Sequence, residues 1–235
     1  MDLKVKDVAE LLNVSEVTIK RWISDGKIPY YRLHNQYRFS RSEVENWVLS
    51  CKQEGDVSLF ASEGSSREQL GTQQFGLFRA IHKGGVYSHV PGKTKQEVIR
   101  NAMEEISKDL HLDAEMITEL LLDREKLMPT ALSNGIGVPH TRDFLLQESF
   151  DVISVVFPEH PIEYGALDDL PVHTLFFLFA CDDRRHLHLL AKIAHLSSHP
   201  ENRSFLEAQP TKQELLEYIK HWEANLKPQE SFSHS

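Results

Sequence analysis

The sequence predicts a layered α/β domain that follows a small unit of two helices, a hairpin and a third helix. The 235 residues provide for one or two hydrophobic cores. The stretch Glu54–Gln74 is rich in Gly, Ser, Gln and Glu, has no sustained apolar period, and is typical of a linker. Behind it, helical and strand-like patterns alternate, which favours α/β layers. The predicted organisation is a domain over 1–50, a linker over 51–76, a second domain over 77–226 and a tail over 227–235.

The composition excludes several classes of protein. Apolar residues make up 40% and charged residues 26%, which excludes a collagen-like, disordered or membrane-embedded chain. The longest apolar run, Leu175–Cys181, falls far short of the roughly 18 to 20 residues that a membrane helix needs. The first residues lack the apolar stretch of a secretory signal. Cys51 and Cys181 form no metal or disulfide pattern. We therefore expect a soluble, cytoplasmic protein without membrane insertion, metal or other cofactor.

The charge is distributed unevenly along the chain. The net charge of −9 argues against a protein that coats nucleic acid indiscriminately. Residues 1–50, however, hold eight basic and seven acidic residues, whereas residues 76–235 hold sixteen and twenty-four. The acidity belongs to the second domain, so a small DNA-binding module at the amino terminus is compatible with the charge.

The first fifty residues show helix-turn-helix spacing. Val5, Val8, Leu11 and Leu12 share one face of a helix, and Asn13–Ser15 forms a turn. A second helix, with Val17, Ile19, Trp22 and Ile23 as its apolar residues, ends at Gly26. A hairpin then reverses at His34–Asn35, and a capping box at Ser40–Glu43 begins a third helix that contains Val44, Trp47 and Val48. The exposed residues of the second helix and the hairpin are predicted to be Glu16, Thr18, Lys20, Arg21, Arg32, His34, Gln36 and Arg38.

This segment resembles the winged helix-turn-helix of the excisionase and MerR-like families. The resemblance rests on VAELLNVSEVTIKRWISDGKIP followed by a short wing that ends in YRFS. It implies that the second helix enters a DNA major groove while the wing contacts the adjacent backbone. The alternative is a three-helix protein-interaction module whose basic residues only solvate its surface. The predicted DNA-binding residues are Thr18, Lys20, Arg21, Arg32 and Arg38.

The second domain begins with helices and continues with strands. A capping box at Thr94–Glu97 predicts a helix over about 95–110, and Asp113 caps a second helix that ends before Pro129. Runs of β-branched and aromatic residues at Val152–Phe157 and Val172–Ala180 predict central strands. A further helix covers His186–Leu196, and a second capping box at Thr211–Glu214 opens the last helix.

A single histidine follows a stiff stretch of backbone. Pro129 ends a helix, Asn134–Gly135 forms a turn, Ile136 to Val138 alternates like a short strand, and Pro139 precedes His140. Neutral imidazole is a good nucleophile near pH 7 and releases a phosphoryl group readily. Such a site needs a cation for the phosphoryl oxygens and a second residue to orient the ring. Arg124 and a histidine from the stretch RRHLHLL at 184–190 meet these needs.

These residues closely resemble the enzyme IIA domain of the bacterial phosphotransferase system, in its fructose, mannitol and nitrogen-regulatory branch. The hallmark LxREKxxxTxxxNGxxxPH is matched by Arg124 through His140, and the likeness extends over 77–226. It implies a mixed sheet flanked by helices. It also implies that a phosphorylated carrier protein phosphorylates His140, supported by Arg124 and by His186 as the second active-site histidine. The implied phosphate loop contains Thr130, Asn134 and Gly135.

The loop before the histidine departs from the family pattern. Met128, Pro129, Ala131 and Ser133 stand where the family shows small residues or glycine. We expect a stiffer loop whose amides face a phosphate less freely, and therefore slow or partner-restricted transfer.

Three functions are compatible with this sequence. The first is a regulator in which phosphate on His140 informs an attached DNA-binding module, through altered domain docking or dimer formation. The second is a phosphorelay or protein-interaction adaptor that does not bind DNA, and the third is a sugar-transport component. A homodimer would suit paired half-sites. A metal site of His140, His186 and His188 is not expected, because no Cys or HExxH spacing supports it.

Overall fold

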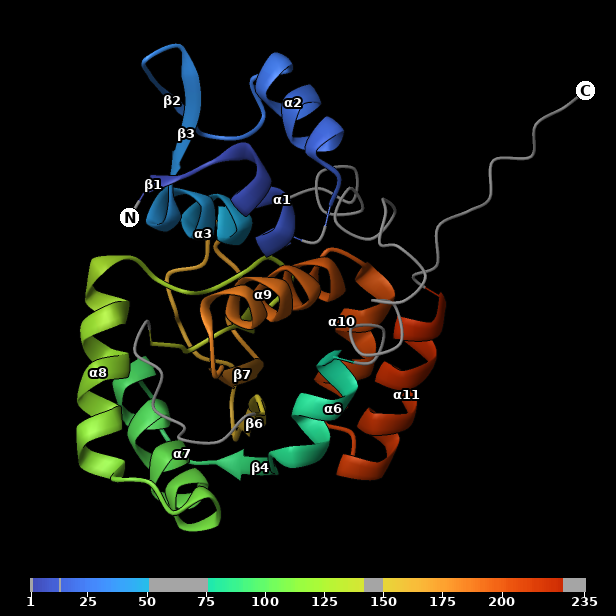
Figure 1. Ribbon diagram of the computed structural model, residues 1–235. Helices are drawn as coiled ribbons and strands as arrows, with labels where there is room; N and C mark the ends of the chain where they lie inside the picture. The colour runs from blue at the N-terminus through green and yellow to red at the C-terminus, as the bar shows by residue number, and fades with distance from the viewer. Residues whose placement is uncertain (1, 13, 51–75, 142–149, 226–235) are drawn as a thin grey trace, which may run out of the picture.

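The computed structural model describes residues 2–12, 14–50, 76–141 and 150–225 (Figure 1). Within the predicted linker it describes only Gly76, which begins helix α6, and the predicted tail lies outside it. None of the helices in the described ranges is long and apolar enough to span a membrane.

The first unit contains the predicted helices and hairpin. Helices α1 (Val5–Leu12) and α2 (Glu16–Ser24) are followed by strands β2 (Tyr31–Leu33) and β3 (Gln36–Ser40) and by helix α3 (Arg41–Ser50). The hairpin reverses where predicted, since His34 and Asn35 adopt positive φ values of 48° and 60°. An unpredicted two-residue strand, β1 (Asp2–Leu3), pairs with β3 and completes a three-stranded sheet.

The predicted faces of α2 are wrong at two positions. Val17 is 74% exposed and Thr18 only 1% exposed, the reverse of the prediction. Ser15 sets the phase of the helix, because its hydroxyl oxygen accepts the Thr18 backbone N–H at 3.1 Å and lies 2.8 Å from the Thr18 hydroxyl. This cap places Thr18 beside Ile19 and Trp22 on the packed side. Thr18 is therefore removed from the predicted DNA-binding residues.

The second unit is built on the predicted mixed sheet. Its strands are β4 (Val86–Val90), β5 (Ile136–Gly137), β6 (Val152–Pro158) and β7 (Thr174–Phe179), in the order β4-β6-β7-β5. The central pair β6 and β7 is antiparallel, and each outer strand pairs with it in parallel. Strands β6 and β7 are the predicted central strands, while β4 was not predicted.

Helices cover both faces of this sheet (Figure 1). The side chains of β6 and β7 alternate between two apolar clusters: Phe176 and Leu178 join one, and Leu175 and Phe177 join the other. Helices α7 (Lys95–Leu110) and α8 (Ala114–Leu127) belong to the second cluster. The opposite layer consists of α6 (Gly76–Lys83), α9 (Asp183–Ser197), α10 (Pro200–Glu207) and α11 (Lys212–Asn225).

The predicted helix starts agree with the capping contacts. Thr94 accepts the Glu97 backbone N–H at 3.2 Å, and Asp113 accepts that of Met116 at 3.0 Å. Glu214 closes a full capping box, since its carboxylate accepts the Thr211 backbone N–H at 2.9 Å. Helix α10 was not predicted.

The two units pack directly against each other. Helices α1 and α3 lie against α9, and one cluster of buried apolar side chains includes Leu12 and Val48 of the first unit and Leu187 of the second. Helix α2 and the β2–β3 hairpin lie on the side of the first unit that faces away from α9 (Figure 1). The helices and strands described for the second unit therefore lie on the other side from the predicted DNA-contacting face (Figure 1).

Acid should destabilise this fold through His195, a buried residue of α9 that packs against His199 and Trp222. Burial, followed by the proximity of His199, lowers the pKa of His195 to about 4 from 6.5. The unfolded chain therefore binds a proton that the folded chain does not, and stability falls as pH drops below about 6.5. In urea unfolding, His195→Gln should reduce the stability lost between about pH 7.5 and pH 5 by about 2 kcal/mol.

The exposed His160 provides the control for this measurement. His160→Gln should leave the pH dependence of the free energy of unfolding unchanged. If His195→Gln loses as much stability at pH 5 as the wild-type chain, proton uptake by His195 does not drive the acid transition.

Candidate phosphorylation site

The backbone that carries His140 is fixed beside the sheet. Thr130 accepts the Val138 backbone N–H at 2.9 Å, and Pro139 accepts that of Leu178 in β7 at 3.0 Å. The His140 side chain is fully buried, and its Nδ1 lies 2.7 Å from the Val138 carbonyl oxygen. This contact orients the ring so that Nε2 faces the opposite side. Nε2 is therefore the ring atom that can act as a nucleophile.

His186 lies against this ring from the first turn of α9. The centroids of the two imidazoles are 5.0 Å apart in an edge-to-face arrangement, and Asp182 caps the helix that carries His186. Burial, followed by the proximity of His140, lowers the pKa of His186 to about 3. His186 is thus neutral at physiological pH, and its Nε2 has no hydrogen-bond partner among the described residues.

Arg124 and a residue of the first unit complete the group. Arg124 lies buried in the last turn of α8, where its Nη1 donates to the Met128 carbonyl at 2.9 Å. Its Nη2 lies 3.2 Å from Oε1 of Glu45, and the same oxygen lies 3.2 Å from His140 Nε2. The structure therefore brings the three predicted residues together, with the fully buried Glu45 of α3 between them.

Glu45 was not predicted as a site residue. On α3 it shares one face with Arg41 and Leu49, four residues away on either side, and Val44 and Val48 belong to the apolar cluster that spans both units. A charged residue at such a position ordinarily faces water. The single sequence signal for the burial of Glu45 was its position beside the apolar residues of α3.

The three predicted phosphate-loop residues have other partners. The Thr130 hydroxyl and backbone N–H both donate to Glu125, whose carboxylate also binds Lys95 at 3.3 Å. Asn134 donates its backbone N–H to Asp168 at 2.7 Å and its side-chain amide to Ser197. Gly135, at φ 74°, leaves no space for a Cβ against His173. These contacts hold the turn that leads to His140, and the role of these residues in a phosphate loop stays a prediction.

The grouping of Glu45, His140 and His186 also deserves comparison with a metal site. One ligand atom from each lies within 4.8 Å of the others. However, Nη2 of Arg124 lies 3.2 Å from Oε1 of this carboxylate, so a fixed positive charge would lie beside a cation bound there. We therefore assign no metal ion to this group.

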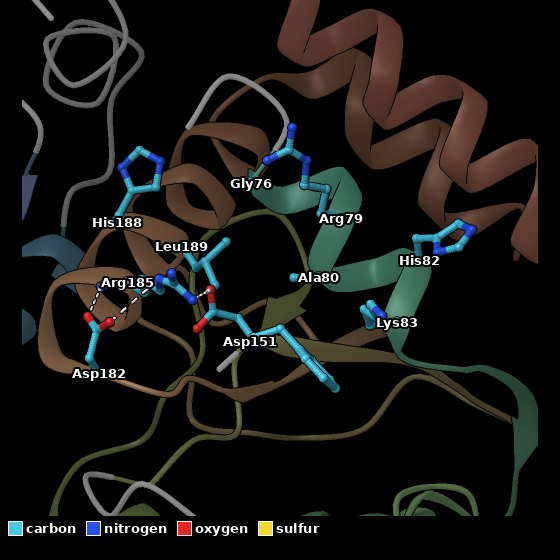
Figure 2. Close-up of a pocket in the computed structure, with 11 residues that line it drawn as sticks. Gly76, Arg79, Ala80, His82, Lys83, Asp151, Asp182, Arg185, His188 and Leu189 are labelled. Atoms are coloured by element: carbon cyan, nitrogen blue, oxygen red, sulfur yellow. Dashed lines mark hydrogen bonds and ion pairs between the residues drawn. The ribbon is translucent and has the colours of Figure 1, made fainter. Parts of the chain in front are cut away.

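A surface cavity of about 590 Å³ lies nearby, between α6 and the start of α9 (Figure 2). His188, the third histidine of the rejected metal site, lines it. Three charged groups of the cavity contact one another: Arg185 lies 3.5 Å from Asp182 and 3.8 Å from Asp151. Lys83 lies 4.5 Å from the centre of the Phe150 ring. These internal pairs give no indication of a bound ligand.

The remaining predicted DNA-binding residues lie on α2 and on the β2–β3 hairpin of the first unit. Lys20 and Arg21 are exposed on α2. On the wing, the Arg32 guanidinium lies over the Tyr37 ring, 5.2 Å from its centre, and Arg38 donates to Gln36 at 2.6 Å. The four cations thus occupy one helix and the adjacent hairpin.

Family models match both parts of the chain. The model described as "Phosphoenolpyruvate-dependent sugar phosphotransferase system, EIIA 2" matches residues 80–222, more than half of the chain. The chain belongs to this family. A model described as "Helix-turn-helix domain" matches residues 3–52, so a helix-turn-helix domain precedes the EIIA domain.

Individual relatives agree with this assignment. A "Nitrogen regulatory protein" of Pseudomonas aeruginosa is 33% identical over 146 residues, which cover 61% of this chain and 94% of the relative. The "Transcriptional repressor DcmR" of Methylorubrum extorquens is 32% identical over 101 residues, covering 41% of this chain and 38% of the relative. The crystal structure of nitrogen regulatory protein IIA-Ntr from Neisseria meningitidis has the same fold, with a TM-score of 0.54, 22% identity, and coverage of 61% of this chain and 98% of that structure.

Proposed function

We propose that this chain is a nitrogen-regulatory-type phosphotransferase protein that accepts a phosphoryl group on His140 and acts as a DNA-binding regulator. The observation that carries the proposal is the grouping of His140 with His186 and Arg124 at one buried point of the EIIA domain. The likeness to nitrogen regulatory proteins over nearly the whole length of the Pseudomonas aeruginosa relative supports the same reading.

The chemistry assigned to His140 is a transfer between two proteins. Nε2 of the neutral ring attacks the phosphorus atom of a phosphorylated carrier protein, forming the P–N bond. The bond from phosphorus to the carrier breaks, and its electron pair leaves with the carrier. The Val138 carbonyl holds the proton on Nδ1 throughout, which keeps the lone pair on Nε2.

Two neighbours support this step. Arg124 supplies a fixed guanidinium for the phosphoryl oxygens, where negative charge is concentrated in the transition state. His186 packs its neutral ring edge against that of His140 and limits the rotation of the nucleophile. Neither residue exchanges a proton in this proposal.

The helix-turn-helix domain supplies the second half of the function. The described first unit carries Lys20 and Arg21 on α2 and Arg32 and Arg38 on the β2–β3 hairpin, the wing. This arrangement suits a helix in the major groove with a wing on the phosphate backbone. The partial likeness to a protein named as a transcriptional repressor favours DNA over a protein partner.

Incubating the full-length chain with a phosphorylated carrier protein of the phosphotransferase system tests the first half. We expect acid-labile, alkali-stable phosphate that maps to the peptide containing His140. Phosphate on another residue, or none under any condition, would overturn the assignment.

Salt-dependent binding to duplex DNA tests the second half. We expect the affinity to fall steeply with salt, because Lys and Arg side chains displace condensed counterions from the phosphates. The adaptor alternative predicts no duplex binding at any salt concentration.

Replacing Arg124 should slow phosphate transfer through the loss of its charge. Arg124 also binds Glu45, so the comparison belongs in a background where that contact is absent. We expect Glu45→Ala/Arg124→Ala to accept phosphate about 100-fold more slowly than Glu45→Ala alone. Equal rates for the two proteins would remove Arg124 from the transition state.

A further inference from the structure

The docked helix-turn-helix unit closes the phosphorylation site. Glu45 lies 95 residues before His140 in sequence, yet its Oε1 lies 3.2 Å from His140 Nε2, and both side chains are fully buried. The helix that carries Glu45 packs on α9, which also carries His186 (Figure 1). A carrier protein has no access to Nε2 while this packing persists.

The Glu45 carboxylate occupies the position that a phosphoryl group would take. A phosphorus atom bonded to Nε2 places its oxygens directly around that nitrogen, in the space that Oε1 of Glu45 fills. Arg124 binds this oxygen at 3.2 Å, and the same guanidinium is the cation that we assign to the incoming phosphoryl group. The contact therefore imitates the anion for which the site is built.

The docked arrangement also engages the nucleophilic nitrogen. Nδ1 of His140 contacts the Val138 carbonyl and Nε2 contacts the Glu45 carboxylate, and both partners are hydrogen-bond acceptors. With Nδ1 directed at the Val138 carbonyl, Nε2 is the nitrogen that faces Glu45. Attack on phosphorus requires Nε2 to face the phosphorus atom, and in the docked arrangement Glu45 stands in that place.

Charge repulsion has the reverse effect as well: phosphate on His140 opposes docking of the helix-turn-helix unit. A phosphohistidine would bring a dianionic group against the buried carboxylate of Glu45. Like charges at contact distance in a buried site repel strongly, and the Arg124 guanidinium that now binds Glu45 would also be drawn to the phosphoryl group. Phosphorylation of His140 would therefore expel Glu45 and the helix on which it lies.

We infer that docking of the helix-turn-helix unit and phosphorylation of His140 exclude each other, with Glu45 as the intramolecular stand-in for the phosphoryl group. The inference rests on the proposed function of His140. Thermodynamic linkage makes the effect reciprocal: whatever stabilises the docked form opposes phosphorylation, and phosphate favours the released form by the same factor.

Glu45→Gln in the full-length chain tests this, because it keeps the size of the side chain and removes its charge. We expect phosphate acceptance from the carrier to be at least about tenfold faster, since losing one partner of a buried ion pair strongly destabilises the docked form. Glu43→Gln, two residues earlier on the exposed side of α3, should match the wild-type rate.

A chemical probe measures access to His140 without the carrier protein. Diethyl pyrocarbonate modifies accessible imidazole nitrogens, and peptide mapping compares His140 with the exposed His160 in the same sample. We expect Glu45→Gln to raise modification of His140 at least about tenfold while that of His160 stays constant. Small-angle X-ray scattering should show that phosphorylation enlarges the wild-type chain.

The outcomes separate this inference from the function on which it rests. Equal transfer rates and equal His140 modification in the wild-type and Glu45→Gln chains would overturn the exclusion and leave phosphorylation of His140 intact. A phosphorylated wild-type chain as compact as the unphosphorylated one would also overturn the exclusion. No phosphate on either chain, with His140 modification still dependent on Glu45, would overturn the proposed function and the exclusion together.

Discussion

His140→Ala should reduce phosphate acceptance at least about a thousandfold, because it removes the nucleophile itself. The measurement is the initial rate of acid-labile labelling from the phosphorylated carrier protein. His188→Ala is the matched control. It also removes an imidazole from α9, two residues from His186, but the His188 side chain lines the surface cavity instead of the site. We expect this variant to be labelled at nearly the wild-type rate.

The buried position of His140 makes a second variant necessary. His140→Ala leaves a cavity and could lower stability, so His140→Gln should be labelled in parallel and both checked for a wild-type circular dichroism spectrum. Both folded variants should fail to accept phosphate. Labelling of either at the wild-type rate would place the acceptor on another residue.

Arg21→Ala should weaken binding to the specific DNA site by about 1 to 3 kcal/mol if its guanidinium reads a base edge. Arg21 is exposed on α2, so the substitution removes no buried side chain. The effect should be much smaller on unrelated duplexes. Binding titrations on specific and scrambled duplexes at several salt concentrations measure the loss of affinity for each kind of duplex.

Arg38→Ala should act differently, because its place on the wing suits a backbone phosphate. We expect weaker binding to all duplexes alike and a salt slope lower by about 1. Lys108→Ala, an exposed change on α7 of the EIIA domain, should alter neither quantity. Unchanged affinity in both arginine variants would exclude α2 and the wing as the DNA-contacting surface.

Local signals predicted most of the fold. The helices that begin at Lys95, Ala114 and Lys212 follow capping residues whose side-chain contacts lie within three or four positions. Strand β1 depends instead on pairing with Phe39 and Ser40, far along the chain. Short strands gain their stability from such distant partners, so a two-residue segment carries almost no pattern of its own.

The site was predicted only in part, because local patterns in the sequence do not record contacts between distant segments. His140 and Arg124 belong to one continuous motif, and His186 follows from the resemblance to the same family. Glu45 is buried by the packing of one domain on another, which no local period records. Thr18 was misplaced because a single cap at Ser15 rotates the whole helix that follows.

Helices α3 and α9 belong to the same polypeptide. Their packing therefore responds differently to the concentration of this protein than binding between two proteins would. Docking is a unimolecular equilibrium, so dilution or overexpression of the protein leaves the closed fraction unchanged. A carrier protein, in contrast, arrives by a bimolecular encounter whose frequency rises with its own concentration. The cell would therefore set the threshold for phosphorylation through the amount of phosphorylated carrier, independently of how many copies of this protein it makes.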